Sequence, residues 1–273
     1  MKIDVTAVVG IVLGLVAVVL GFVLEGGKAG ALLESTAAII VFGGTMGATM
    51  VSFSLAEVKR LPQFFKTAFN ALEFEPTALI DQLCGWAKIA KMGDRIRGLE
   101  AAQKETPDRF LRKGLQLLAD GKKLDEIQSV LETDMYAEQE VLKAGSEVFA
   151  TAGGFAPTMG IAGTVMGLIH VLGELGGGAA ALGHAIGLAF IATLYGVGSA
   201  NLVWIPLSSN LKTKAKRVHT LREIALDGFV LMGRDGGIVP HELKPLLLAH
   251  IEAATPNAAP PEAARPVAAR RTG

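Results

Sequence analysis

The sequence predicts an all-α, polytopic membrane protein with four transmembrane helices in two hairpins and a helical cytoplasmic domain. Hydrophobic residues make up 51% of the 273 residues and charged residues only 19%, whereas a soluble domain carries about 25% charge. The apolar residues gather in four blocks that lack Asp, Glu, Lys and Arg. Each block is long enough to cross about 30 Å of hydrocarbon as a helix.

The four blocks define the expected membrane helices. Their limits are Val5–Leu24, Ser35–Ala56, Val148–Gly173 and Leu175–Leu211, and the last helix is expected to start near Leu182. Each must be helical, because lipid offers no partner for exposed backbone groups. The first block is longer than the apolar core of a cleavable signal peptide, so we expect it to be retained as a membrane helix.

The positions of Lys and Arg predict the orientation. Of the 26 basic residues, 14 lie between the second and third blocks and 10 follow the fourth, while the first hairpin loop holds only Lys28. Because basic residues stay on the cytoplasmic side, both termini and the long middle segment are expected in the cytoplasm. The chain is therefore expected to be a multi-pass inner-membrane protein.

This orientation gives an expected domain organisation. Residues 1–56 form a first membrane hairpin, 57–147 a cytoplasmic helical domain and 148–211 a second membrane hairpin. A cytoplasmic helical segment, 212–253, follows, and the Ala/Pro-rich tail, 254–273, lacks the apolar side chains needed to fold. Within the cytoplasmic domain, Pro76 and Pro107 are expected at helix starts or breaks.

The composition gives no argument for an enzyme. The chain has one cysteine, Cys84, which we interpret as a reduced cytoplasmic thiol. The sequence contains no metal-spaced Cys/His cluster, no nucleophile–base pair and no phosphate-binding loop, and its net charge of zero does not favour nucleic-acid binding. No cofactor is expected.

The membrane blocks contain polar features that suit ion movement. Pro157 lies inside the third block and cannot donate a backbone hydrogen bond, which leaves the carbonyl of Gly153 free. Thr164 follows on the same helix face, and Thr193 lies in the middle of the fourth block. Such threonines either bond their own helix carbonyls or line a path. No ionisable Asp, Glu, Lys or Arg lies in a membrane core, so an ion-carrying carboxylate would have to come from a partner.

Two further features of the membrane blocks are less specific. Each block has a pair of glycines four residues apart, a spacing that lets helices approach closely. His170 and His184, near the outer ends of the third and fourth helices, are interpreted as interfacial packing residues, with pH sensing as the alternative. The glycine pairs are Gly10 and Gly14, Gly43 and Gly47, Gly163 and Gly167, and Gly183 and Gly187.

Several runs resemble the MotA/PomA family of flagellar stator proteins. They are Val41–Thr49, Ala156–His170, Leu182–Gly196 with Asn201 and Pro206, and the opening segment around Gly14 and Gly21. The resemblance implies a pentamer around two copies of a single-span MotB/PomB-type partner, which supplies an ion-carrying Asp and anchors to peptidoglycan. The ring would turn and drive the flagellar rotor switch protein. The wider superfamily includes TolQ and ExbB, so an ion-driven energiser of an envelope process is the alternative; a purely structural scaffold is a weaker one.

The resemblance also assigns residues. Pro157 and Pro206 match the family's coupling prolines, and Thr164 and Thr193 match the threonines that line the ion path in sodium-type members. Sodium is therefore the expected transported ion and a proton the alternative.

The same resemblance extends to the rotor contact. Glu100 matches the acidic residue that contacts the rotor. The family's basic partner falls at Met92, so Lys91, Arg95 or Arg97 is expected to replace it.

Overall fold

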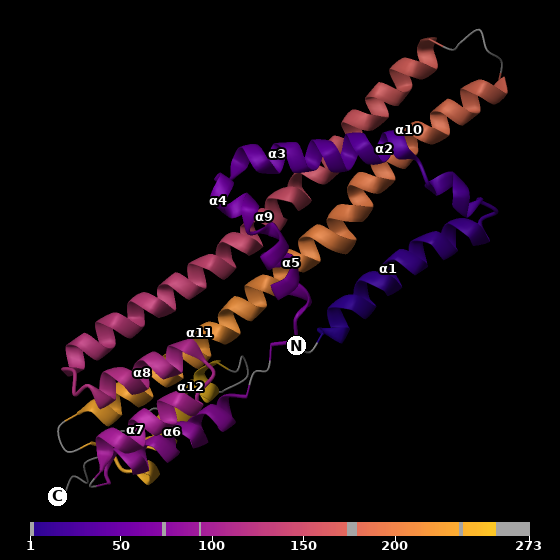
Figure 1. Ribbon diagram of the computed structural model, residues 1–273. Helices are drawn as coiled ribbons and strands as arrows, with labels where there is room; N and C mark the ends of the chain where they lie inside the picture. Colours follow the sequence, from indigo (N-terminus) through magenta and orange to yellow (C-terminus); the bar gives the residue numbers. More distant parts are fainter. Residues whose placement is uncertain (1–2, 73–74, 93, 174–178, 235–236, 255–273) are drawn as a thin grey trace, which may run out of the picture. The chain divides into compact units, whose positions relative to one another are not determined.

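The structure is a computed structural model (Figure 1) that describes residues 3–72, 75–92, 94–173, 179–234 and 237–254. The described chain is almost wholly helical and contains no strand, only an isolated bridge between Ile3 and Asn70. Four of its helices are long and apolar enough to cross a membrane. The all-α fold class with four membrane helices is therefore confirmed. The expected disordered tail, 254–273, lies outside the described residues except for Ala254.

The chain divides into two compact units. One comprises residues 1–73 and 137–217, and the other comprises 74–136 and 218–273. Two long helices, α9 (Leu124–Gly173) and α11 (Ile205–Gly233), contribute to both. The sequence limits at 148 and 212 thus fall inside continuous helices. Residues 124–147 continue the helix because only Gly145 among them weakens it and no proline stops it.

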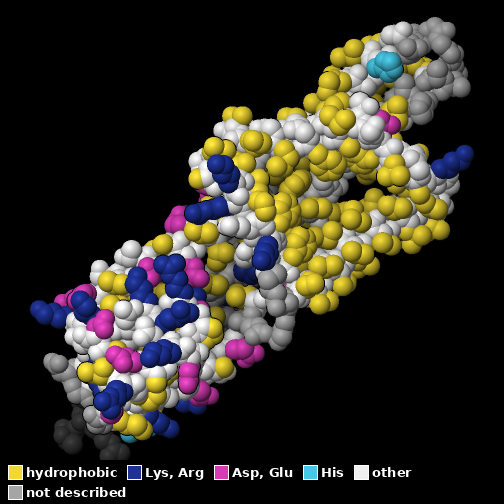
Figure 2. Space-filling model, in the orientation of Figure 1, with side chains coloured by type: hydrophobic (Ala, Val, Ile, Leu, Met, Phe, Trp, Pro, Cys, Tyr) yellow, Lys and Arg dark blue, Asp and Glu magenta, His cyan; other side chains and the backbone are white. Residues whose placement is uncertain are grey.

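The first unit begins with α1 (Val5–Leu24), an almost purely apolar helix. The Asp4 carboxylate caps it by accepting a hydrogen bond from the Ala7 N–H at 3.2 Å. No residue of α1 is buried within the chain, and Figure 2 shows hydrophobic atoms covering much of the visible surface of this unit. Such a helix is suited to contact lipid or another chain.

The second membrane segment contains a π-helical turn. After η1 (Ala29–Leu32), α2 (Ser35–Ala38) leads into the π-turn η2 (Ile39–Gly43) and α3 (Gly44–Ser52) without a break. Two short helices then follow, α4 (Leu55–Lys59) and α5 (Leu61–Phe69). In α4, Ser54 and Glu57 form a reciprocal capping box that fixes the chain where it leaves the span.

The second hairpin is made by α9 and α10 (Ala179–Ser199). A π-turn, η3 (Ala200–Trp204), joins α10 to α11, so the fourth membrane segment is a continuous helical rod. Three aromatic rings pack together here, with ring centroids 4.8 to 6.3 Å apart: Phe149 of α9, Trp204 of η3 and Phe65 of α5. This aromatic cluster holds α5 against the hairpin.

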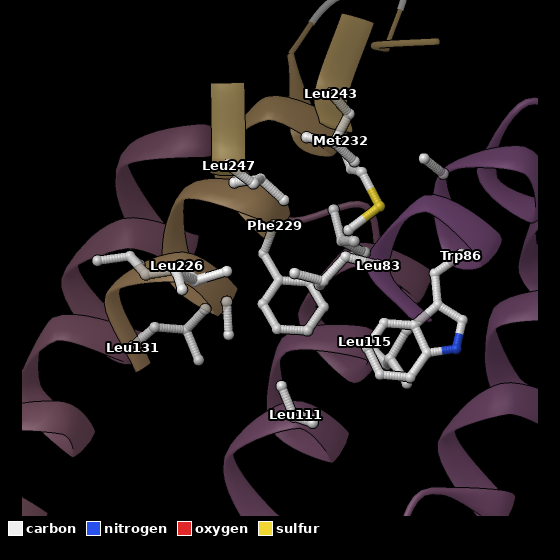
Figure 3. Packing of buried hydrophobic residues seen from close by; sticks show 14 of the residues in the cluster. Leu83, Trp86, Leu111, Leu115, Leu131, Leu226, Phe229, Met232, Leu243 and Leu247 are labelled. Atoms are coloured by element: carbon white, nitrogen blue, oxygen red, sulfur yellow. The ribbon is translucent and has the colours of Figure 1, made fainter. Parts of the chain in front are cut away.

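The second unit has its own hydrophobic core. It is built from α6 (Pro76–Ala90), α7 (Arg95–Glu105), α8 (Arg109–Ala119), α12 (Pro240–Ala254) and the adjoining ends of α9 and α11. Figure 3 shows Phe229 in the middle of this core, surrounded by Leu83, Leu115 and Met232. Gly114 makes room for the Phe229 ring, since a Cβ there would lie 2.2 Å from a ring carbon.

Two sequence expectations about this unit are met. Pro76 is the first residue of α6 and Pro107 lies between α7 and α8. Cys84 is a free, buried thiol, and its burial raises its pKa. The thiol therefore stays protonated and unreactive.

A buried ion pair fastens the N-terminal end of α1. The Lys214 ammonium, 8% exposed, lies 3.0 Å from the Asp4 carboxylate. It also donates to the carbonyls of Thr67, Ala68 and Asn70 at 2.6 to 3.2 Å, which satisfies the open end of α5. Burial opposes the charged form of Asp4, but hydrogen bonds from Lys214 and the Ala7 N–H outweigh it, so the pKa of Asp4 is lowered.

Replacing Asp4 with Asn should destabilise the first unit by about 2 kcal/mol, the scale of a charge-assisted hydrogen bond. Because the folded pKa is lowered, this contribution is complete above the ordinary carboxyl pKa and is lost as pH falls through the lowered value. The difference in thermal unfolding midpoint between the wild type and Asp4→Asn should therefore stay constant near neutral pH and shrink only in acid. The matched control is Asp81→Asn, which breaks an exposed pair with Lys244. If Asp4→Asn lowers the unfolding midpoint no more than Asp81→Asn does, the ion pair of Asp4 with Lys214 does not stabilise the first unit as described.

Candidate functional site

Glycines bring α9 and α10 into backbone contact. A Cβ on Gly196 would lie 2.5 Å from the Ala156 carbonyl oxygen and 2.9 Å from the Gly160 Cα. Farther along, Gly163 and Gly167 pack against Ala192 and Ala189. This part of the α9–α10 pairing admits no side chain at the glycine positions.

The other expected glycine pairs are used differently. Gly14 of α1 faces Leu202, whereas the space next to Gly10, Gly43, Gly47 and Gly187 is open. Close packing within the chain therefore explains the pair in α9 fully and the pair in α1 in part. The open glycines leave room for another molecule.

The close approach brings Thr164 and Thr193 together. Their Oγ1 atoms lie 2.5 Å apart. Thr164 Oγ1 also lies 2.9 Å from the Ala189 carbonyl of α10 and 3.1 Å from the Gly160 carbonyl of its own helix. Two hydroxyls and two carbonyls thus converge at one partly buried point. Neutral oxygen atoms of this kind are the ligands that hard cations prefer.

Pro157 and Pro206 lie away from this oxygen cluster. Pro157 is half-buried inside α9, about 10 Å along the helix from Thr164 at 1.5 Å per residue. Gly153, whose carbonyl Pro157 leaves free, packs against Ile205, about 16 Å from Thr164 by the same measure. The carbonyl that Pro157 leaves free therefore lies too far along α9 to be a ligand beside Thr164. Pro206 is exposed in the first turn of α11, directly after the π-turn.

A cavity lies next to the oxygen cluster on the α2 side. Its volume is about 380 Å³, and its lining includes Ala189, Gly163, Glu34 and His170. The backbone N–H of Glu34 donates to the Tyr195 hydroxyl at 3.0 Å, which ties the loop before α2 to α10. In the sequence, Glu34 has no signal of a site except that it directly precedes the second uncharged block. His170 is exposed at the cavity, and the side chain of His184 lies outside the described residues.

The residues expected at the rotor contact lie in the second unit, at α7 and the end of α6. Glu100 is exposed, and Arg97 lies 3.7 Å from Asp94 in an exposed ion pair. Arg95 donates to the Leu118 carbonyl at 3.4 Å. Lys91 and Arg95 also line a cleft of about 370 Å³ with Arg234, a residue that sequence analysis did not single out. The cleft groups three basic side chains and leaves Arg97 outside it.

Taken together, these features define a class of protein: a multi-pass, helical membrane subunit that offers neutral oxygen ligands but no membrane carboxylate. Residues 8–95 match the model of the motility protein A N-terminal region, and residues 102–224 match that of the MotA/TolQ/ExbB proton channel family. The chain is 33% identical over 243 residues to motility protein A of Bacillus subtilis, covering 88% of this chain and 89% of that protein. The chain therefore belongs to the motility protein A family, a family of flagellar stator subunits and not of enzymes.

Another relative and two solved structures support the same family. The chain is 30% identical to chemotaxis protein PomA of Vibrio alginolyticus, over 85% of this chain and 90% of that protein. Among solved structures, it is similar to the flagellar MotAB stator complex of Bacillus subtilis, with a TM-score of 0.83, 32% identity and coverage of 92% of this chain and 97% of that chain. The C. jejuni MotAB structure gives a TM-score of 0.82 at 26% identity, with 93% and 98% covered. These relationships and the four apolar helices make the chain a multi-pass inner-membrane protein.

Proposed function

We propose that this chain is the ring subunit of an ion-driven flagellar stator, with five copies surrounding two copies of a MotB/PomB-type single-span partner. The observation that carries the proposal is the Thr164–Thr193 oxygen cluster in a chain without a membrane carboxylate. The match of residues 8–95 to the motility protein A N-terminal model and the two solved MotAB complexes favour this role over a TolQ/ExbB-like energiser. Both termini lie in the cytoplasm, following the distribution of basic residues.

The partner supplies the charge and this chain the neutral ligands. An Asp on the partner helix binds the cation, and the hydroxyls of Thr164 and Thr193 with the Ala189 carbonyl replace part of its water shell. Leaving that shell unreplaced in an apolar environment is costly. This need favours sodium, since a proton requires only the carboxylate; the proton is the alternative ion. Pro157 lies level with the π-turn and Pro206 lies just after it, and the two prolines couple ion binding to movement of the two helices.

The first test is ion flux through the chain without its partner. Reconstituted alone in liposomes, the chain should take up neither sodium nor protons above the background of empty vesicles, because its membrane segments contain no carboxylate that could carry the ion. Co-reconstitution with a MotB/PomB-type partner should give uptake, and the same complex with the partner's membrane Asp changed to Asn is the control. Uptake by this chain alone would refute the shared ion site.

The second test concerns the rotor contact of the second unit. Glu100→Lys, Arg95→Glu and Arg97→Glu should each reduce torque partially, since an exposed charge pair contributes at most about 1 kcal/mol. The triple variant should reduce torque further while the membrane assembly is retained. Torque is measured from the rotation of tethered cells. Lys143→Glu, an exposed reversal on α9, is the control, and full torque in the triple variant would reject this surface.

A further inference from the structure

The second membrane hairpin leaves one face of α9 and one face of α10 uncovered. Both faces are apolar and exposed: Ile161 on α9 is 58% exposed and Phe190 on α10 is 65% exposed. The residues recur at spacings of three and four, so each set forms a single helix face. The α9 face comprises Gly154, Thr158, Ile161, Val165 and Ile169, and the α10 face comprises Gly187, Phe190, Leu194, Gly198 and Asn201.

Each face carries one polar side chain, and the two are complementary. The Thr158 hydroxyl donates to the Phe155 carbonyl at 2.7 Å, which leaves its oxygen free to accept. The Asn201 side-chain nitrogen donates one hydrogen bond to the Val197 carbonyl at 2.9 Å, which leaves its second N–H to donate. Both side chains are exposed. Facing lipid, the second N–H of Asn201 would have no acceptor, which costs free energy.

Thr158 and Asn201 lie in the same layer of the hairpin. Gly153 packs against Ile205 and Gly160 against Gly196, so α9 and α10 run antiparallel in a fixed register. Thr158 falls between the two glycines of α9, and Asn201 falls between their two partners. The side chains cannot meet within one chain, however. Thr158 lies roughly 140 to 200° around α9 from Gly153 and Gly160, and Asn201 lies roughly 140° around its helix from Gly196, at about 100° per residue.

The same register makes the two faces complementary in shape. Because Gly167 packs against Ala189, Ile169 of α9 lies in the layer of Gly187 of α10. Gly154 and Gly187 both border open space, with nothing within 4 Å of an added Cβ. A bulky side chain on one face is thus matched by a glycine on the other, as close helix packing in membranes requires.

We propose that these faces are the contact between adjacent copies of this chain, with Asn201 of one copy donating its second N–H to Thr158 Oγ1 of the next. The contact joins two different patches, so it is heterologous and generates a ring when its rotation closes. The inference rests on the ring assembly proposed above and adds the residues that set the register between copies. Thr158 adjoins Pro157, so the hydrogen bond fixes neighbouring copies at the layer of the coupling proline.

Cysteine cross-linking tests this contact in the full chain co-expressed with its partner protein. In a Cys84→Ala background, the double variant Thr158→Cys and Asn201→Cys should form disulfide-linked dimers and a ladder of larger species under mild oxidation. Neither single variant should do so, because the contact is heterologous. The matched control pairs Thr158→Cys with Met50→Cys, since Met50 is 51% exposed on a different membrane helix. Native mass spectrometry on the same samples gives the number of copies.

The outcomes separate this contact from the proposed function. A multi-copy assembly without cross-links in the double variant overturns the contact and leaves the stator function standing. Cross-linking of either single variant indicates a two-fold contact and also overturns it. A monomer in the mass measurement overturns both the contact and the ring. As a second readout, Thr158→Ala or Asn201→Ala should weaken the association of copies about threefold per interface, the usual effect of one interhelical hydrogen bond in a membrane. Because both changes remove the same hydrogen bond, the double variant should associate no more weakly than either single variant.

Discussion

Replacing Gly196 with alanine is expected to disrupt the α9–α10 crossing and abolish motility. The added methyl would lie 2.5 Å from the Ala156 carbonyl oxygen and 2.9 Å from the Gly160 Cα. Both neighbours are backbone atoms that cannot rotate away, so the helices must separate. Overpacking of this kind costs about 1–3 kcal/mol. Separation also pulls the Thr193 hydroxyl away from Thr164, so the oxygen cluster should be lost even where the protein still assembles.

A lower thermal unfolding midpoint in detergent and the absence of swimming are the measured results. Gly47→Ala is the matched control, because nothing lies within 4 Å of a Cβ at that position. It adds the same methyl group to another membrane helix and should leave the unfolding midpoint near that of the wild type. Equal midpoints for the two variants would mean that the α9–α10 contact is not as close as the structure indicates.

Replacing Thr164 with alanine is expected to weaken the sodium dependence of the motor strongly. The substitution removes the hydroxyl that lies 2.5 Å from Thr193 Oγ1 and 2.9 Å from the Ala189 carbonyl. The loss of one ligand, at about 1.4 kcal/mol, should raise the sodium concentration for half-maximal speed on the order of tenfold. Rotation speed as a function of external sodium measures the change.

Two control variants separate the hydroxyl from the space it fills. Thr164→Ser keeps the hydroxyl and should retain most of the sodium response. Thr49→Ala removes a buried membrane threonine whose hydroxyl donates to the Thr45 carbonyl of its own helix at 2.7 Å, so it should leave the half-maximal sodium concentration unchanged. If protons drive the motor, none of these variants should change how motor speed depends on external sodium.

Much of the fold could be predicted because it depends on local composition. Apolar blocks without charge specify membrane helices wherever they occur, and Pro76 begins a helix because its ring suits the first turn. The continuity of α9 was not predicted, although the absence of proline from residues 124–147 allows it. The π-turns at Ile39–Gly43 and Ala200–Trp204 were not predicted either, because they depend on packing between segments far apart in the chain, which periodicity does not reveal.

The candidate site was predicted only in part, for the same reason. Thr164 and Thr193 stood out as polar residues in apolar blocks, and the structure brings them together. The Ala189 carbonyl has no sequence signal, because every residue carries one. Lys214 could not be singled out, because it is one of several basic residues in its segment of the sequence. In the structure, however, its ammonium is buried beside Asp4. The position of Arg234 beside Lys91 likewise depends on the packing of α6 against α11.

The measurement that tests the central claim most directly is motor speed at fixed pH while external sodium is varied, in cells whose only stator contains this chain and its partner. We expect that motor speed rises with external sodium and saturates, and that Thr164→Ala shifts this curve to higher sodium concentrations. A speed that does not change with sodium would contradict the proposed role of the Thr164–Thr193 oxygen cluster and leave the proton as the driving ion.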